Sequence, residues 1–371
     1  MRIAAILLSL AAMAVAQPLQ QPQPAQRPWM IGPFTRPAEG NPVITPKAQS
    51  VFHDPIRNAD VHWEALHTFN PAAVVRDGKV YVLYRAEDDT GTMQIGMHTS
   101  RLGLAESSDG ISFTRSATPI FYPDEDGQKA HEWPGGVEDP RLVESLDGGY
   151  VLTYTQWNRE TYSVGIATSP DLIHWTKHGP AFGAAKYSDL KYKSAGIVTT
   201  IKDGRLIAAR IQGKFWMYWG EGVIRLATSS DLIHWTPVED SAGKPLELLQ
   251  PRRGHFDSTF PETGPPPVLT GRGIVILYNG KNAASGGDAS LGAGAYAVGE
   301  ALFSAGHPSR LLAQVDKPVL QPVLPYEKTG QYAAGTTFAE GLVLFHGRWF
   351  LYYGCADSLV AVATAPLNGM R

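Results

Sequence analysis

Cysteine is almost absent from this chain of 371 residues, since Cys355 is the single one. One cysteine can form neither an intrachain disulfide nor a cysteine-based metal site, so burial alone must stabilise the fold. The 11 histidines are scattered and show no spacing typical of metal ligands. We therefore expect no metal and no cofactor.

Strong charge and long periodic stretches are lacking too. The net charge of -3, without a long basic cluster, argues against nucleic acid as a partner. No extended window repeats every 3.6 residues, and neither a G-x-S-x-G motif nor a phosphate-binding glycine loop is present. The 38 glycines and 28 prolines, beside many aromatic residues, favour short strands and tight turns. The sequence predicts an all-β fold.

The N-terminus resembles a secretion signal. A positive end at Arg2 precedes an apolar run from Ile3 to Met13 and an A-x-A cleavage site at 14–16. The run is too short for a membrane anchor. We predict a signal peptide at 1–16, a Pro/Gln-rich linker at 17–28 and a secreted or periplasmic protein. The alternative is a frayed apolar N-terminus of a cytosolic protein.

A decapeptide repeat sets the expected architecture. Ala167-Thr-Ser-Pro-Asp-Leu-Ile-His-Trp-Thr176 and Ala227-Thr-Ser-Ser-Asp-Leu-Ile-His-Trp-Thr236 are nearly identical, and 105–114 is a looser copy. Ser-x-Asp forms a turn in each copy, and the following aromatic packs on a neighbouring strand. Because the pattern is repeated, we expect His174, Trp175, His234 and Trp235 to be structural.

Extending the repeat outward gives five units of four strands, each opening on a polar motif. Five such units predict a five-bladed β-propeller spanning 29–371. Asn41-Pro-Val-Ile44 matches the Pro-hydrophobic strings that end the other units, so the N-terminal segment should complete the last blade and close the ring. A two-sheet sandwich is the alternative. The units open at 69–72, 138–141, 193–196, 262–266 and 335–337.

The starts of innermost propeller strands surround one axis, so these motifs should surround one pocket. Several carboxylates, arginines and aromatic residues (Trp63, Trp133, Trp219 and Tyr278) lie near them, a mixture that suits sugar binding. Glycosidic cleavage needs two carboxyl groups, one to protonate the leaving oxygen and one to activate water or attack. Neighbouring carboxylates in a partly apolar pocket would acquire different pKa values.

A structural explanation exists for each candidate. Asp139 and Arg141 could tie two blades, and Arg85 and Arg101 could pair with Glu87 and Asp88. Glu221 could be a solvated turn residue, and Glu262 could belong to the rigid turn before its prolines. These alternatives stay open at the level of sequence.

Five motifs in order resemble glycoside hydrolase family 130: Phe69-Asn-Pro-Ala72, Tyr84-Arg-Ala-Glu-Asp88, Ser100-Arg-Leu-Gly103, Gly136-Val-Glu-Asp-Pro-Arg141 and Glu262-Thr-Gly-Pro-Pro266. The resemblance covers about Asn41 to Pro366. It implies a five-bladed propeller acting on β-mannosides, by phosphorolysis or by hydrolysis of β-1,2 linkages. It also implies that Asp139 is the catalytic acid, working in the phosphorylases through the mannosyl 3-hydroxyl.

The departures from the phosphorylase pattern favour hydrolysis. The phosphorylase Tyr-His-Gly string corresponds to Tyr278-Asn279-Gly280, without the histidine, and the His-Arg-Pro string corresponds roughly to 218–221, which brings in Glu221. A carboxylate repels a phosphate dianion and can instead deprotonate water. Lys193 lies near a position typical of the phosphorylases, and this residue favours phosphorolysis instead.

We therefore predict an exported, exo-acting, inverting β-1,2-mannosidase with Asp139 on the acid side and Glu221 as the base. The alternatives are a β-mannoside phosphorylase and a non-catalytic glycan-binding propeller. A mannoside oligosaccharide is the expected partner. The residues expected to bind it are Asn70, Arg85, Asp88, Ser100, Arg101, Glu138, Arg141, Lys193, Glu262, Tyr278, Asn279 and Asp357.

Overall fold

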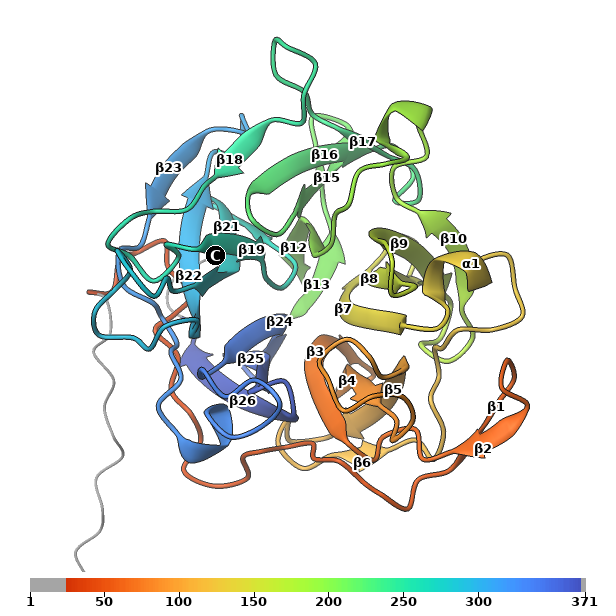
Figure 1. The fold of residues 1–371 in the computed structure, drawn as a ribbon. Helices are drawn as coiled ribbons and strands as arrows, with labels where there is room; N and C mark the ends of the chain where they lie inside the picture. Colours follow the sequence, from red (N-terminus) through yellow and green to blue (C-terminus); the bar gives the residue numbers. More distant parts are fainter. Residues whose placement is uncertain (1–24, 368–371) are drawn as a thin grey trace, which may run out of the picture.

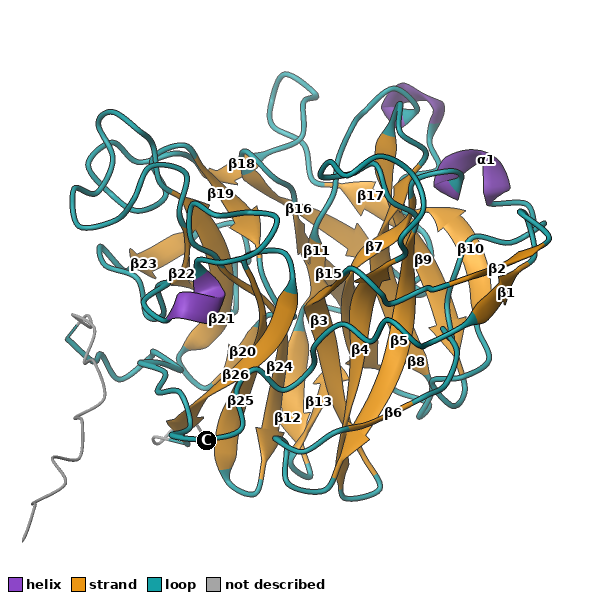
Figure 2. Ribbon diagram, turned by 60° about the horizontal axis from the view of Figure 1, so that its bottom comes forward, coloured by secondary structure: helices purple, strands orange, loops and turns teal. Residues whose placement is uncertain are grey.

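The computed structural model describes residues 25–367, and β-strands dominate it. The predicted all-β class is confirmed. Figure 1 shows the strands gathered into sheets around a common centre, following the chain from red to blue, and Figure 2 shows the sheets in a turned view. The predicted signal peptide at 1–16 and the first part of the predicted linker lie outside the described residues. Within 25–367, no helix is long and apolar enough to cross a membrane.

The first two units are four-stranded antiparallel meanders. The Asp77-Gly78 turn joins the first two strands, and both of its residues have positive φ, as a two-residue hairpin requires. The first unit comprises β3 (His67–Arg76), β4 (Lys79–Glu87), β5 (Ser100–Ser107) and β6 (Thr114–Arg115). The second comprises β7 (Gly136–Glu144), β8 (Tyr150–Trp157), β9 (Tyr162–Ser169) and β10 (Thr176–Pro180).

The third and fourth units contain shorter strands with interruptions. In the fourth, β19 (Phe260–Thr263) and β20 (Val268–Thr270) both pair with β21 (Gly273–Lys281), because the prolines at 265–267 lack donors and interrupt the strand. That unit continues with β22 (Tyr296–Phe303) and β23 (Leu311–Gln314). The third unit contains β11 (Ala195–Ile197), β12 (Thr199–Lys202), β13 (Arg205–Ala208), β14 (Arg210–Ile211), β15 (Lys214–Trp219), β16 (Ile224–Ser229), β17 (Trp235–Pro237) and β18 (Glu247–Leu249).

The fifth unit is a three-stranded sheet whose last strand is covered by the N-terminal segment. Ile44 forms a bridge with Val360, and the Asn41 side chain exchanges two hydrogen bonds with the backbone of Val362, at 2.8 and 2.9 Å. The edge is therefore paired at the segment that the sequence indicated. The strands are β24 (Thr337–Phe345), β25 (Arg348–Cys355) and β26 (Leu359–Pro366). Shorter elements are β1 (Phe52–Asp54), β2 (Ala59–Val61), α1 (Lys129–Glu132), η1 (Ala185–Tyr187) and η2 (Pro325–Glu327).

The repeated decapeptides form identical turns. Asp171 and Asp231 each accept two backbone N–H groups, and the leucine after each has positive φ. The looser copy places Gly110 at the same position. His174 and His234 pair with the aspartates of their own turns and are at least 80% exposed. These contacts support a structural role for both histidines.

Three inner strands each carry a β-bulge. The pairing register shifts between Phe69 and Pro71, between Glu138 and Arg141, and between Ala339 and Gly341. A bulge redirects the side chain of its extra residue. The bulges in β3 and β7 hold Asn70 and Asp139, both with φ near +47°.

Candidate active site

All five units contribute to one cavity of about 310 Å³, within the range of small-molecule sites. Asn70 and Asp139 reach it from the bulges in β3 and β7. Glu262 reaches it from β19, and Asp357 from the turn between β25 and β26. The prediction that distant strand starts converge on one pocket is thus met for Asn70, Asp139 and Glu262. The lining residues are Phe69, Asn70, Arg85, Ile95, Gly96, Glu138, Asp139, Thr155, Trp157, Tyr162, Lys193, Glu221, Glu262, Tyr296, Tyr332, Phe338 and Asp357.

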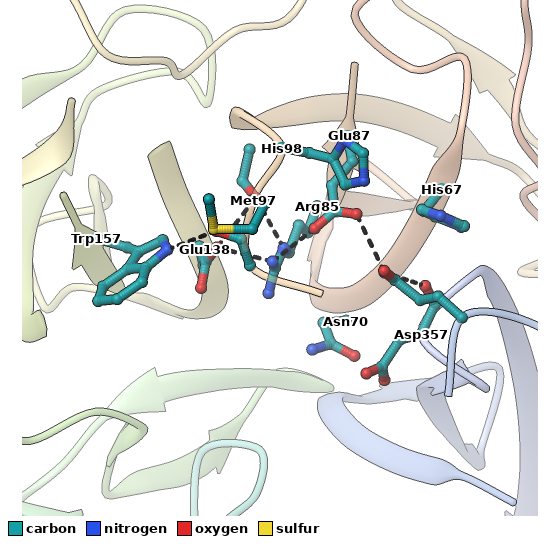
Figure 3. A network of polar contacts seen from close by, with 12 residues as sticks. His67, Asn70, Arg85, Glu87, Met97, His98, Glu138, Trp157 and Asp357 are labelled. Atoms are coloured by element: carbon teal, nitrogen blue, oxygen red, sulfur yellow. Dashed lines mark hydrogen bonds and ion pairs between the residues drawn. The ribbon is translucent and has the colours of Figure 1, made fainter. Parts of the chain in front are cut away.

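Arg85 organises one side of the cavity. Its guanidinium contacts Asp139 at 3.1 Å and Glu87 and Glu138 at 2.7 Å each, and Figure 3 shows it between the two glutamates. Asn70 donates a second hydrogen bond to Asp139 Oδ1, at 2.8 Å. The structural pairing of Arg85 with Glu87 therefore coexists with a place in the pocket wall. Asp139 is held in a fixed orientation by charged and neutral donors.

Lys193 organises the opposite side. Its Nζ lies 3.3 Å from Glu221 Oε1 and 3.6 Å from Glu262 Oε1. Glu221 and Glu262 also form an isolated backbone bridge, so the two carboxyl-bearing segments are direct neighbours. Ser194 donates to Glu262 at 2.5 Å. The side chain of Glu221 is 27% exposed, whereas that of Glu262 is fully buried.

Burial and neighbouring charges give the carboxyl groups different pKa values. Burial raises the pKa of Glu138, Glu262 and Asp357 to about 7 each, since nearby cations oppose it incompletely. Burial also acts on Asp139, but Arg85 and Lys193 outweigh it and lower the pKa of this group to about 2. An ionised Asp139 thus lies among carboxyls that hold protons near neutral pH, a division useful for acid–base chemistry.

Aromatic side chains form much of the remaining wall. Tyr296 contacts Tyr332 and Phe338 with ring centroids 5.5 Å apart in both pairs. Trp157 donates from Nε1 to the carbonyl of Gly96, which fixes its ring beside the cavity. Such faces pack against the C–H surfaces of a sugar ring, while the charged groups bond its hydroxyls.

Six residues predicted to bind substrate do not line the cavity. Their side chains form hydrogen bonds or ion pairs with other groups of the protein instead. Arg101 is fully buried between Asp88 (2.7 Å) and Asp54, which is the structural pairing left open for Arg101 and Asp88. The Ser100 hydroxyl accepts a hydrogen bond from Arg85 and donates one to Glu138.

The other three residues also bond groups of the protein. Tyr278 donates to Asp257, and Asn279 exchanges two hydrogen bonds with the backbone of Ala339. Arg141 donates hydrogen bonds to the backbone carbonyls of Asp139, Thr263 and Gly264.

The pocket aromatics also differ from the expected ones. Trp63, Trp219 and Tyr278 are fully buried in the core, and the cavity uses Trp157, Tyr296 and Tyr332 among others. Trp157 was within reach of sequence reasoning. It ends β8, which runs antiparallel to β7, so it lies opposite Gly136 beside the Glu138-Asp139 motif. Tyr332 stands in a loop, where no sequence signal marks it.

The chain is similar to known proteins over nearly its full length. The sequence model of glycoside hydrolase family 130, described as "beta-1,4-mannooligosaccharide phosphorylase", matches residues 36–370. The chain belongs to glycoside hydrolase family 130. The resemblance noted from the motifs is therefore confirmed.

Relatives within the family carry two kinds of names. A 1,2-beta-oligomannan phosphorylase from Thermoanaerobacter sp. (strain X514) is 29% identical over 89% of this chain and 96% of its own. One solved structure is 50% identical with a TM-score of 0.91, covering 93% of this chain and 97% of its own, and is described in the words "The GH130 family of mannoside phosphorylases contains glycoside hydrolases that target beta-1,2 mannosidic linkages in Candida mannan". A glycosyl hydrolase from Bacteroides ovatus is 47% identical with a TM-score of 0.91, covering 94% and 98%. The family description and the curated relative's name favour phosphorolysis, whereas the two solved structures are described as hydrolases or as bearing on them.

Proposed function

We propose that this chain is an exo-acting β-1,2-mannosidase that hydrolyses the linkage at the nonreducing end with inversion. The observation that carries the proposal is the excess of carboxyl groups over cations in the cavity wall, where five carboxyl residues face Arg85 and Lys193. Lys193 already contacts Glu221 and Glu262, so a phosphate dianion placed beside it would meet two carboxyl groups. Water meets no such repulsion.

Glu221 is assigned as the base that activates water. It is the most accessible of the carboxyls that contact Lys193 or Arg85 in the cavity wall, so a water molecule can reach it. Asp139 is assigned to the acid side, directly or through a sugar hydroxyl. Because its pKa of about 2 leaves it ionised in the free protein, Asp139 must take up a proton once substrate is bound, and Glu138 on the same Arg85 is a neighbouring donor that would become ionised in its place. Inversion requires carboxyl groups about 6.5–9.5 Å apart, with water between one of them and the sugar.

The decisive experiment is proton NMR of β-1,2-mannobiose with the protein, with and without phosphate. Hydrolysis with inversion predicts α-mannose as the first product at an equal rate in both samples. Mannose 1-phosphate formed only with phosphate would refute hydrolysis. Saturable binding without release of any product would indicate a glycan-binding protein instead.

Variants test the two assigned roles. We expect Asp139→Ala and Glu221→Ala each to lower kcat by at least about 100-fold, the lower end for general acid–base groups. Glu125→Ala, which removes an exposed carboxylate in an i,i+4 pair with Lys129, serves as the matched control and should leave kcat unchanged. Activity within tenfold of wild type for either pocket variant would remove that residue from its role.

Phosphorolysis is the second candidate, and the description of the family model and the names of the curated relatives support it. On this alternative Lys193 would contact phosphate, and Glu221 would have to release Lys193 or be protonated. Lys193→Met then separates the candidates, because it should raise the KM for phosphate in a phosphorylase and leave a hydrolase indifferent to phosphate.

We also propose that the five units form a closed five-bladed propeller and that the chain is exported. The pairing of the N-terminal segment with β26 supports closure of the ring. The apolar run before the A-x-A site supports export. The mass of the protein recovered from the medium or the periplasm would test export, and a chain that keeps residues 1–16 would contradict cleavage there.

A further inference from the structure

Arg141 joins β7 and β19, the two strands that carry three of the five carboxyl residues in the cavity wall. Its guanidinium donates to the carbonyl of Asp139 at 2.9 Å on its own strand, β7. Across the site it donates to Thr263 at 2.7 Å and Gly264 at 3.2 Å, at the end of β19 directly after Glu262. One side chain therefore links segments more than 120 residues apart in sequence.

A third strand supplies a buried carboxyl group as a partner of the guanidinium. Glu340, the extra residue of the bulge in β24, lies 2.9 Å from Arg141 Nη1, and both side chains are at most 1% exposed. Neither carboxylate oxygen of Glu340 has a further hydrogen-bond partner among the described residues. Phe338, two residues earlier on β24, lines the cavity, with its ring centroid 6.0 Å from the Arg141 guanidinium carbon. β7, β19 and β24 thus meet at one guanidinium.

The backbone that Arg141 holds is unusual. Asp139 has φ +48°, in the left-handed region, and Pro140 follows it. A non-glycine residue persists in this conformation when its surroundings fix it, which here includes the bond from Arg141 to the Asp139 carbonyl. The planar fork of arginine can serve three carbonyls in fixed directions, whereas a lysine ammonium cannot reproduce that geometry.

We propose that Arg141, with Glu340 as its buried partner, is a positioning residue that sets the placement of Asp139 relative to Glu262 and the adjoining Glu221. It does not touch substrate. The proposal rests on the proposed function, because it assigns to Arg141 the placement of the carboxyl groups that act there. A shift of about 1 Å in such groups lowers turnover by up to about 100-fold.

Arg141→Lys tests the proposal, and Arg101→Lys is the matched control. Arg101 is equally buried and paired with two aspartates, yet it contacts none of the cavity-lining segments around Asp139 or Glu262. Both variants should have a lower Tm than wild type. We expect Arg141→Lys to lower kcat at least about tenfold with KM within about threefold of wild type, and Arg101→Lys to keep kcat within about twofold.

Glu340→Gln keeps the shape of the partner side chain and serves if Arg141→Lys does not fold. It should lower kcat less than Arg141→Lys but more than Arg101→Lys. Wild-type kcat in both Arg141→Lys and Glu340→Gln, or a rise in KM alone, would overturn the positioning role. So would an equal loss of kcat in Arg101→Lys. An inactive wild type would overturn the proposed function and this proposal together, whereas equally active variants of an active enzyme overturn this proposal only.

Discussion

Replacing Glu262 with glutamine removes a titrating carboxyl that is fully buried in the cavity wall. Burial is the main reason that its pKa is raised from 4.5 to about 7, with Lys193 opposing and Glu221 adding to the rise. Between these two values the folded protein holds a proton that the unfolded chain has released. Stability therefore falls as pH increases through this window, because the native state binds more protons than the unfolded state.

The magnitude follows from the two pKa values. The full difference corresponds to about 3 kcal/mol, at about 1.4 kcal/mol per pH unit. Between pH 5 and pH 8, Glu262 alone should lower the free energy of unfolding by about 2–3 kcal/mol. Glu262→Gln should lose this component, so its stability should decline less steeply with pH than that of wild type.

Urea unfolding at pH 5, 6, 7 and 8 measures the difference. The quantity to compare is the change in free energy of unfolding with pH in each protein, not the absolute stability, since glutamine also alters the contacts with Ser194 and Lys193. Glu125→Gln, which changes an exposed carboxylate, should run parallel to wild type. Parallel curves for wild type and Glu262→Gln would refute the argument that burial governs this carboxyl.

Three further outcomes follow from the contacts. Arg85→Met leaves three buried or nearly buried carboxylates without their cation and should lower the free energy of unfolding by about 3–5 kcal/mol in urea titrations, and an effect below about 1 kcal/mol would contradict the network. If proton donation draws on Glu138, kcat should decline above about pH 7 as that carboxyl ionises, and a flat profile from pH 6 to 9 would exclude it as the source. Asp231→Ala removes two backbone hydrogen bonds from a repeat turn and should lower stability by about 1 kcal/mol with unchanged KM, whereas a raised KM would place that turn in the site.

Local patterns made much of the fold predictable. The Asp-Gly turns, the Ser-x-Asp turns and the alternating strands depend on contacts between residues close in sequence. The repeat showed how many units to expect, and the matching Pro-hydrophobic string at Asn41 indicated the segment that pairs with β26. The Glu138-Asp139-Pro140-Arg141 motif, which opens the second unit, places Glu138 and Asp139 in one wall of the cavity.

Tertiary structure decided which charged residues face the cavity. Arg85 and Arg101 both lie near a strand end, and the sequence left open for each a structural pairing with Glu87 or Asp88. Arg85 of the first unit forms an ion pair with Asp139 of the second unit. Arg101 instead pairs with Asp54 of the β1–β2 hairpin, which lies 47 residues earlier in the chain. The sequence by itself determined the strands, the turns and the carboxyl motif, because short-range contacts and strand alternation govern them. Only the folded chain decided which charges reach substrate, because a buried arginine pairs with whichever carboxylate the packing brings to it, however distant in sequence.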